Sequence, residues 1–365
     1  WRVVMHTPLL EIDLAKIKYN AQRIKDFCEK SDIDICIVTK GFCAELPIVE
    51  ALIKDGHNFF GDARIQNIAK IKREFPDVKY MMIRIPKISE AEEVIRYADI
   101  SLQSQLEVIK AYSDKAKSMG KVHSIILMID VGDLREGVMP EDSGALVEDI
   151  LAMNGVRLIG IGTNVGCYGG ILPTVENAKI LVNLRDSLEK AYGIELPIIS
   201  GGSTCALKLL REGKLPKEIN NLRIGEAVIL GEDSTNGLFI ENLHWDAFIL
   251  KAEVVELRQK PSVPMGRSGY DAFGNQPVFL DKGIRKRAIL AIGRQDVRIE
   301  ALAPVSEGME ILGGSSDHLI VDVTDSKEKV EPGSLIAFRC AYSAVLSLTT
   351  SPYVEKVFMP LASGR

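Results

Sequence analysis

The amino-acid sequence predicts an α/β protein in which a (β/α)8 barrel is followed by a C-terminal β domain. Short apolar runs alternate with helical patterns over the first two-thirds of the 365 residues, which is typical of βα units and a parallel sheet. Eight candidate strands with seven helical stretches between them match a (β/α)8 TIM barrel. After about residue 235 the helical periodicity is nearly absent, which indicates a β domain.

Each element rests on a residue pattern. A first helix over 14–29 places Ile17, Ala21, Ile24 and Phe27 on one face. The barrel strands are short apolar runs, predicted at 34–38, 58–61, 80–84, 100–103, 124–130, 158–162, 196–200 and 222–224. Helical patterns lie between them, for example at 45–54, 65–74, 90–97 and 175–192. Turn residues separate the strands of the β domain, which are predicted at 254–257, 288–292, 319–323 and 335–339.

We therefore expect a barrel over 8–235 and a β domain over 236–365 that is joined by residues 1–10. A doubly wound open sheet is the alternative to the barrel. That fold usually places a G-x-G-x-x-G turn after its first strand. Here the corresponding turn is Thr39-Lys40-Gly41-Phe42, which favours the barrel.

Composition argues against several classes of protein. The net charge of −5 comes without a basic block, so we expect no nucleic-acid partner. No apolar run reaches the roughly 18 residues that a membrane span needs. The six cysteines are scattered without C-x-x-C pairs, which predicts reduced thiols in the cytoplasm. The five histidines lack metal-ligand spacing, so no metal centre is expected.

Lys40 is the first candidate for chemistry because it ends the first barrel strand. Function in a TIM barrel is found at the C-terminal ends of the strands. Desolvation and nearby positive charge there would lower the pKa of a lysine and make it a Schiff-base nucleophile. A solvated lysine at a strand end is the simpler alternative for this residue taken alone.

A candidate anion site follows the seventh strand, in Ser200-Gly-Gly-Ser-Thr204. Two glycines allow close approach of the backbone to a ligand, and a helix start offers free N–H groups. An ordinary helix cap is the alternative, but TIM barrels often bind phosphate in the loops after strands 7 and 8. The predicted ligands are Ser200, Gly202, Ser203 and Thr204.

The eighth strand ends in Arg223-Ile-Gly-Glu226. Gly225 can present its N–H to the same phosphate, and Arg223 points into the barrel mouth, where it needs an acceptor. A structural salt bridge is the alternative for Arg223. A lysine after strand 1 and a phosphate cradle after strands 7 and 8 suggest pyridoxal phosphate (PLP). A sugar-phosphate aldolase with a Schiff-base lysine uses similar parts and stays open on these residues alone.

These motifs together resemble the fold-type III PLP enzymes, the alanine-racemase-like family. The segments around Lys40, Ser200–Thr204 and Leu222–Glu226 are similar to its cofactor-lysine, phosphate and pyridine segments. Asp130-Val-Gly-Asp-Leu-Arg135-Glu-Gly matches the D-x-G-x-x-R-x-G segment of racemases. Further similar segments are Pro8–Leu14, Gly61–Asn67 and Gly314–Leu319. As a whole the chain looks most like the ornithine and lysine racemase branch.

The resemblance implies residue roles. Lys40 would hold the cofactor and act as base on one face of the substrate, and Arg135 would contact the cofactor phenolate. Asn164 would sit where alanine racemases have a ring-packing histidine. Arg223 would face the pyridine nitrogen; it stays protonated, so it cannot pass a proton to that nitrogen, which would limit transamination. Glu226 adjoins this segment and belongs to the expected cofactor site.

The C-terminal domain supplies the other expected residues. Its 314–319 segment resembles one that comes from the second subunit in related racemases and decarboxylases, which implies a homodimer with shared active sites. Asp317, with Ser316, is the first candidate to bind the distal ammonium of a basic substrate, and Asp133 is the second. Tyr270 is the nearest candidate for the base on the opposite face.

The chain departs from the family in two places. Met128 falls where alanine racemases often carry a modified lysine that supports the arginine, and Tyr270 is offset by a residue or two from the family's base tyrosine. The expected function is racemisation of a basic amino acid, ornithine or lysine. The alternatives are a decarboxylase of the same fold and a PLP-binding carrier without catalysis. Glu226 leaves the decarboxylase open, whereas the additional β domain argues against the carrier.

Overall fold

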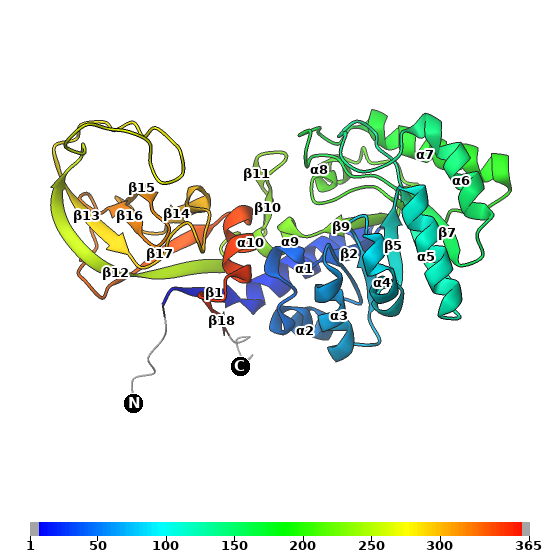
Figure 1. Ribbon diagram of the computed structural model, residues 1–365, viewed down its shortest axis with the longest axis horizontal. Coiled ribbons are helices and arrows are strands. Elements are labelled where there is room, and N and C mark those ends of the chain that lie inside the picture. The colour runs from blue at the N-terminus through cyan, green and yellow to red at the C-terminus, as the bar shows by residue number, and fades with distance from the viewer. Residues whose placement is uncertain (1–6, 360–365) are drawn as a thin grey trace. The chain divides into compact units, whose positions relative to one another are not determined.

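The computed structural model describes residues 7–359, which form two compact units (Figure 1). One unit is Lys16–Trp245; the other consists of the described residues up to Ala15 and from Asp246 onward. The division into domains at residue 235 stays a prediction, and residues 1–6 of the expected 1–10 connection lie outside the described residues. Among residues 7–359, no helix is long and apolar enough to cross a membrane.

Eight parallel strands close into a barrel in the first of these units. In chain order they are β2 (Asp34–Val38), β3 (Phe59–Asp62), β4 (Lys79–Met82), β5 (Ile100–Gln103), β6 (His123–Met128), β7 (Val156–Gly162), β8 (Ile198–Ser200) and β9 (Asn221–Ile224). The last strand, β9, pairs with β2, so that Cys36 is opposite Arg223. The (β/α)8 prediction is therefore confirmed, and the open sheet is excluded.

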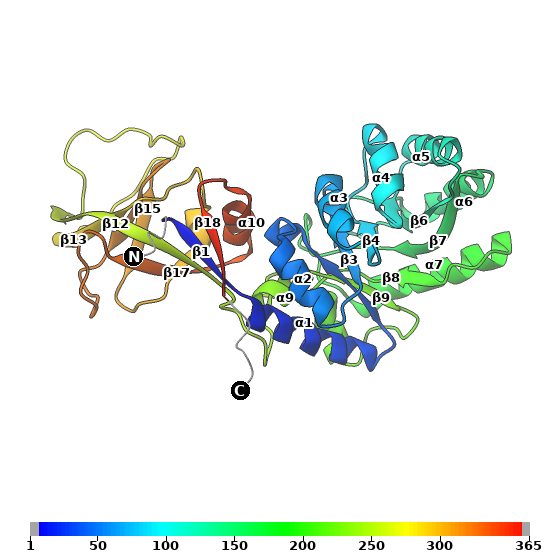
Figure 2. The same cartoon turned by 90° about the horizontal axis from the view of Figure 1, so that it is seen from below.

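Helices precede and connect the barrel strands, as Figure 2 shows from a second direction. They are α1 (Leu14–Glu29), α2 (Leu46–Lys54), α3 (Ile65–Glu74), α4 (Ala91–Tyr97), α5 (Leu106–Ser118), α6 (Ser143–Leu151), α7 (Val175–Tyr192), α8 (Ala206–Arg211) and α9 (Glu226–Leu230). Three 3-10 turns add η1 (Lys40–Phe42), η2 (Ile88–Glu90) and η3 (Pro140–Asp142). Ile17, Ala21 and Ile24 are buried, so the predicted face of the first helix packs inward.

A buried apolar cluster connects neighbouring barrel strands. Cys36, Met81, Leu102, Ile126 and Met128 belong to it and come from β2, β4, β5 and β6. Side chains alternate between the two faces of a strand, and the inward set of a TIM barrel fills its interior. Because all eight strands are parallel, their C-terminal ends meet at one rim, where the loops that carry the candidate residues begin.

The second unit contains an eight-stranded sheet. Its strands are β1 (Leu9–Asp13), β12 (Phe248–Pro261), β13 (Ile284–Leu290), β14 (Leu302–Pro304), β15 (Glu310–Gly314), β16 (Leu319–Asp322), β17 (Leu335–Cys340) and β18 (Glu355–Met359). The four predicted strands fall on β12, β13, β16 and β17. Helical structure is not absent, however: η4 (Ile299–Ala301) and α10 (Tyr342–Thr350) accompany the sheet. The N-terminal strand β1 pairs with both β12 and β18.

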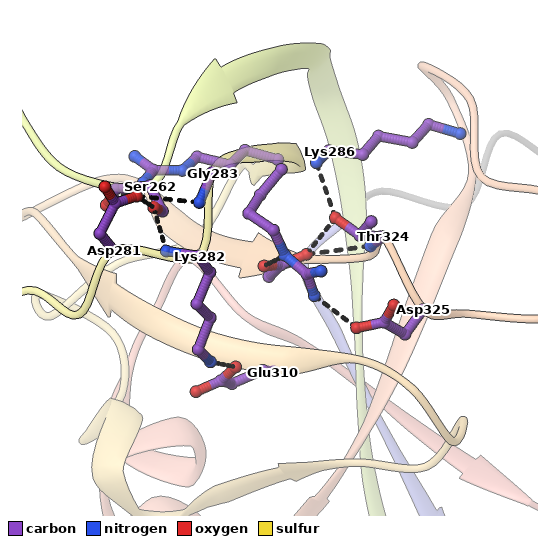
Figure 3. Close-up of polar contacts among 11 residues, drawn as sticks. Ser262, Asp281, Lys282, Gly283, Lys286, Glu310, Thr324 and Asp325 are labelled. Atoms are coloured by element: carbon purple, nitrogen blue, oxygen red, sulfur yellow. Dashed lines mark hydrogen bonds and ion pairs between the residues drawn. The ribbon is translucent and has the colours of Figure 1, made fainter.

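Polar contacts hold together the two ends of the long connection between β12 and β13, as Figure 3 shows. Ser262 Oγ donates to Asp281 at 3.1 Å and accepts from the amide of Lys282 at 2.7 Å. The ammonium of Lys282 pairs with Glu310 at 2.7 Å. The connection is therefore anchored at its base, while Tyr270 in its middle is 77% exposed.

Candidate active site

Lys40 lies at the C-terminal end of β2, where it begins the turn η1. Its side chain is exposed, while the preceding Thr39 is fully buried and donates its amide to the carbonyl of Gly61 at 2.9 Å. The lysine therefore extends from a fixed backbone at the rim of the barrel.

Asp62, at the end of β3, fixes that backbone through its side chain. Its carboxylate accepts hydrogen bonds from Thr39 Oγ1 at 2.6 Å, the amide of Arg64 at 2.8 Å and Asn67 Nδ2 at 3.2 Å. Burial raises the pKa of Asp62, and these hydrogen bonds together with the charge of Lys40 oppose that rise. The carboxylate thus acts on Lys40 through Thr39 and through its own negative charge.

Arg223 of β9 is buried inside the barrel unit, and two of its guanidinium nitrogens donate hydrogen bonds to neighbouring residues. It donates to Ser200 Oγ and, at 2.7 Å, to the carbonyl of Thr163. Ser200 Oγ in turn donates to Asn221 Oδ1 at 2.5 Å. Burial lowers the pKa of Arg223 to about 10, so the guanidinium remains charged at neutral pH.

The loop after β8 offers hydrogen-bond donors. Among the described residues, the amides of Gly202, Ser203 and Thr204 donate to no backbone carbonyl, and the amide of Ser203 interacts with Cys205 Sγ. Gly202 has φ +121°, a conformation that an L side chain rarely adopts. Thr204 Oγ1 accepts from the amide of Ala227 at 3.4 Å and so links this loop to α9. Three amides and the Ser203 hydroxyl form a donor set that suits a phosphate.

Gly225 and Glu226 form the start of α9. A Cβ on Gly225 would lie 3.1 Å from the Cβ of Val38, so this position is closely packed against the end of β2. Glu226 Oε2 accepts from the amide of Ser234 at 3.3 Å, while its buried Oε1 has no partner among residues 7–359. Burial raises the pKa of the Glu226 carboxyl.

Arg135 lies on the loop between β6 and η3. Burial alone would lower its pKa, but the paired carboxylate of Glu136, with smaller contributions from Cys167 and Asp133, raises it. Glu136 also raises the pKa of Arg223, which Arg135 lowers. The structure therefore brings Arg135, Glu136 and Arg223 into one electrostatic cluster.

Three further expected positions lie at or after the ends of β6 and β7. Asn164 follows Thr163, whose carbonyl accepts from Arg223. Met128, at the end of β6, is fully buried in the apolar cluster of the barrel. Asp133 is 2% exposed, and both of its carboxylate oxygens accept backbone hydrogen bonds, from Tyr168 and Gly169.

Tyr270, Ser316 and Asp317 lie in the other compact unit. Tyr270 and Asp317 are exposed, and Ser316 Oγ donates to Asp317 Oδ2 at 2.7 Å. Within the barrel unit, by contrast, hydrogen bonds or electrostatic interactions link Arg135, Thr204 and Arg223 to neighbouring loops. The roles assigned to all these residues stay predictions.

Sequence reasoning did not single out Asp62, Glu136 or Thr163. Asp62 and Glu136 both stand inside motifs that were recognised, Gly61–Asn67 and Asp130–Gly137. For Glu136 the available signal was its position directly after Arg135. Asp62 is distant from Lys40 in the sequence, and only the pairing of β2 with β3 brings the two together. Thr163 acts through its backbone carbonyl, which no residue type encodes.

Comparison with known proteins decides the family. The model of the alanine racemase N-terminal domain matches residues 12–233. The chain belongs to the alanine racemase family. It is 45% identical to the ornithine racemase of Acetoanaerobium sticklandii, over 96% of this chain and 99% of that protein. It is 43% identical to the lysine racemase of Thermotoga maritima, over 97% and 99%. The resemblance stated from the motifs is thereby confirmed.

Solved structures of alanine racemases share the fold. The enzyme from Clostridium difficile superposes with a TM-score of 0.76 at 19% identity and covers 98% of this chain and 97% of its own. The enzyme from Bartonella henselae, with covalently bound pyridoxal phosphate, gives 0.74 at 17% identity over 97% and 100%. The likeness of fold therefore extends over both compact units, the barrel and the β sheet.

Proposed function

We propose that this member of the alanine racemase family is a PLP-dependent racemase that interconverts the L and D forms of a basic amino acid, ornithine or lysine. One observation carries the proposal: the chain is 45% and 43% identical to an ornithine and a lysine racemase over nearly its whole length. The near-complete coverage, with the β unit included, favours an enzyme over a one-domain carrier.

The donors of the barrel fit PLP. The amides of Gly202–Thr204, which donate to no backbone carbonyl, and the hydroxyl of Ser203 suit its phosphate. Lys40 at the end of β2 supplies the amine that would hold its aldehyde carbon. When bound, PLP withdraws electrons from the substrate and thereby acidifies the Cα–H bond.

The protein's own groups then determine what happens to that proton. Lys40 removes or returns it on one face, and a second group, for which Tyr270 is our candidate, acts on the other face. Arg223 is held by Ser200 and Thr163 and is charged at neutral pH. It would donate a hydrogen bond to the pyridine nitrogen of the cofactor and would transfer no proton to it. This favours reprotonation at Cα over transamination, and it disfavours the decarboxylase alternative, whose members generally place a carboxylate there.

We also propose that the active form is a homodimer with shared sites. Apolar side chains are exposed on the two loops that follow β6 and β7: Leu134 (69%), Met139 (39%), Tyr168 (77%), Ile171 (40%) and Leu172 (47%). Clustered exposed apolar residues are typical of protein interfaces. In the homodimer that we propose, Tyr270 and Asp317 would act across subunits. The six cysteines are free thiols, which supports a cytoplasmic location.

The test is to incubate the purified protein with PLP and a panel of L-amino acids in deuterium oxide. Proton NMR follows exchange at Cα, and chiral chromatography follows the D isomer. Exchange accompanied by growth of D-ornithine or D-lysine is expected. Amine formation would instead identify a decarboxylase, and a cofactor-bound protein without exchange on any amino acid would contradict the proposal.

A further inference from the structure

One side chain joins two loops at the rim of the barrel. Asp133, on the loop that follows β6, accepts hydrogen bonds from two amides of the loop that follows β7. Tyr168 donates to Oδ2 at 3.0 Å and Gly169 donates to Oδ1 at 3.1 Å. The carboxylate is 2% exposed, so a charged group is retained in a buried position by these two backbone donors.

We propose that Asp133 is a positioning residue: it fastens the β7–α7 loop to the β6–η3 loop and thereby sets how Arg135 and Asn164 face the cofactor. The inference rests on the proposed function, since it assumes a cofactor between those two residues. It replaces the expectation that Asp133 binds the substrate ammonium. Both oxygens of this carboxylate already accept a backbone amide and the residue is almost fully buried, so little of it is open to a substrate cation.

The β6–η3 loop is held together by hydrogen bonds within itself. The carboxylate of Asp130 accepts from the amides of Gly132 at 2.8 Å, Leu134 at 3.2 Å and Arg135 at 3.1 Å. Asp133 lies within this ring of hydrogen bonds, two residues before Arg135. The amides of Tyr168 and Gly169, which Asp133 binds, are therefore fixed in position relative to the backbone of Arg135.

The second loop is anchored at its start by other elements. Thr235 Oγ1 donates to the carbonyl of Gly166 at 2.8 Å, and Cys205 Sγ donates to that of Val165 at 3.4 Å. These contacts adjoin Asn164 on the side of the phosphate loop, while Asp133 holds the other side at Tyr168 and Gly169. Asn164 thus precedes a segment that is held at Val165 and Gly166 by one set of contacts and at Tyr168 and Gly169 by Asp133. Loss of Asp133 removes the second set.

Gly169, on the β7–α7 loop, allows that loop to approach Asp133 closely. A Cβ at this position would lie 2.9 Å from the carbonyl oxygen of Asp133 and 3.3 Å from its Oδ1. The backbone of Gly169 adopts no left-handed conformation, so alanine is tolerated by the chain itself and disturbs only the approach to Asp133. Gly169→Ala therefore perturbs the same contact without a change of charge.

The experiment compares Asp133→Ala, Asp133→Asn, Gly169→Ala and the double alanine variant. Glu141→Gln is the matched control, because Glu141 is an exposed acid of the same segment. Hydrogen exchange reports the amides of 165–172, absorbance titration gives the Kd for PLP, and steady-state assays give kcat and KM separately. Unfolding midpoints establish that each variant is folded.

We expect Asp133→Ala to accelerate exchange at Tyr168 and Gly169 by about tenfold or more. PLP affinity should fall about tenfold, and kcat should fall about 10- to 100-fold with a smaller change in KM, because displaced groups align poorly with the reacting atoms. Asp133→Asn keeps one acceptor and should be intermediate. The double variant should be little worse than the worse single variant, because both substitutions break one contact.

Unchanged exchange at 165–172 in Asp133→Ala would overturn the proposal. So would faster exchange with PLP affinity, kcat and KM all within twofold of the wild type. A rise in KM for ornithine alone, with the other quantities unchanged, would return Asp133 to substrate binding. If Asp133→Ala does not fold, Gly169→Ala decides by the same criteria. Failure of the proposed function is recognised separately, since the wild-type protein itself would then show no racemisation.

Discussion

Ser200 Oγ accepts a hydrogen bond from the guanidinium of Arg223 inside the barrel. The same hydroxyl donates to Asn221, so Ser200 is committed to two residues of β9. The neighbouring hydroxyl of Ser203 is only partly buried, and its contact is with Cys205 Sγ at 3.5 Å. The two serines of one motif thus have different surroundings, which leads to the first prediction.

Ser200→Ala should lower the free energy of unfolding, whereas Ser203→Ala should lower phosphate affinity. The first change leaves Arg223 Nη1 and Asn221 Oδ1 without their buried partner, at about 1–3 kcal/mol for an unsatisfied group. Ser203→Ala should change stability by less than about 0.5 kcal/mol and raise the Kd for PLP. Denaturant unfolding and absorbance titration measure the two effects. Equal effects of both substitutions on PLP affinity would contradict this division.

Lys40 should be the residue that carries PLP. Borohydride reduction followed by peptide mapping should find the pyridoxyl label on Lys40. Its amine is exposed at the C-terminal rim of the barrel, the same rim from which the candidate phosphate loop extends. Lys40→Ala should lower kcat by at least about 10²–10⁴-fold, the usual contribution of a positioned base. A label on any other lysine of the wild-type protein would refute the assignment.

Asp317→Asn should weaken the use of ornithine selectively. Loss of a charge-assisted hydrogen bond to the distal ammonium costs about 1.5–3 kcal/mol, which lowers kcat/KM for ornithine roughly 10- to 150-fold. Racemisation of norvaline, which has similar length and no charge, should change little. An equal fall on both substrates would assign Asp317 to the fold or the cofactor, where its present partner is Ser316.

Subunits with different lesions should complement one another if the active sites are shared. Lys40→Ala and Tyr270→Phe protomers are each expected to be inactive. Mixed under conditions in which the chains exchange, they should form some heterodimers with one intact site and recover part of the activity. Demonstrated exchange without any recovery would mean that Tyr270 does not act across subunits.

Glu232→Gln should remove a loss of stability that occurs as the pH rises towards neutrality. Burial, with the Glu226 carboxylate as a second cause, raises the pKa of Glu232 to about 7, whereas an unfolded glutamate titrates near 4.3. A raised pKa in the folded state stabilises the protein fully below about pH 4, and this contribution is lost as the pH rises through 7. The unfolding midpoint of Glu232→Gln minus that of the wild type should therefore increase between pH 5 and 8. Exposed Glu195→Gln serves as control, and a pH-independent difference for Glu232→Gln would refute the coupling.

Much of the barrel could be predicted because the spacing of apolar residues in its helices and strands matches the faces that are buried. The helices at 14–29, 65–74 and 175–192 have the predicted bounds, and all eight strands are present. Apolar spacing reports which face of a helix is buried, and a buried parallel strand is a short continuous apolar run. The strand-end positions of Lys40, Ser200 and Arg223 followed directly from that order.

The sequence alone determined the barrel, the position of Lys40 and the family, because each depends on local patterns or on motifs in a fixed order. Only the tertiary structure decided that Ser200 holds Arg223, 23 residues away, and that Asp133 holds Tyr168, 35 residues away. The structure also decided that α10 accompanies the sheet and that β1, near the N-terminus, pairs with β12, which is distant in the sequence. A hydrogen-bond partner is chosen by which loops the closed barrel brings together, and a buried carboxylate or hydroxyl takes whichever donor lies there. Local patterns contain no information about that choice.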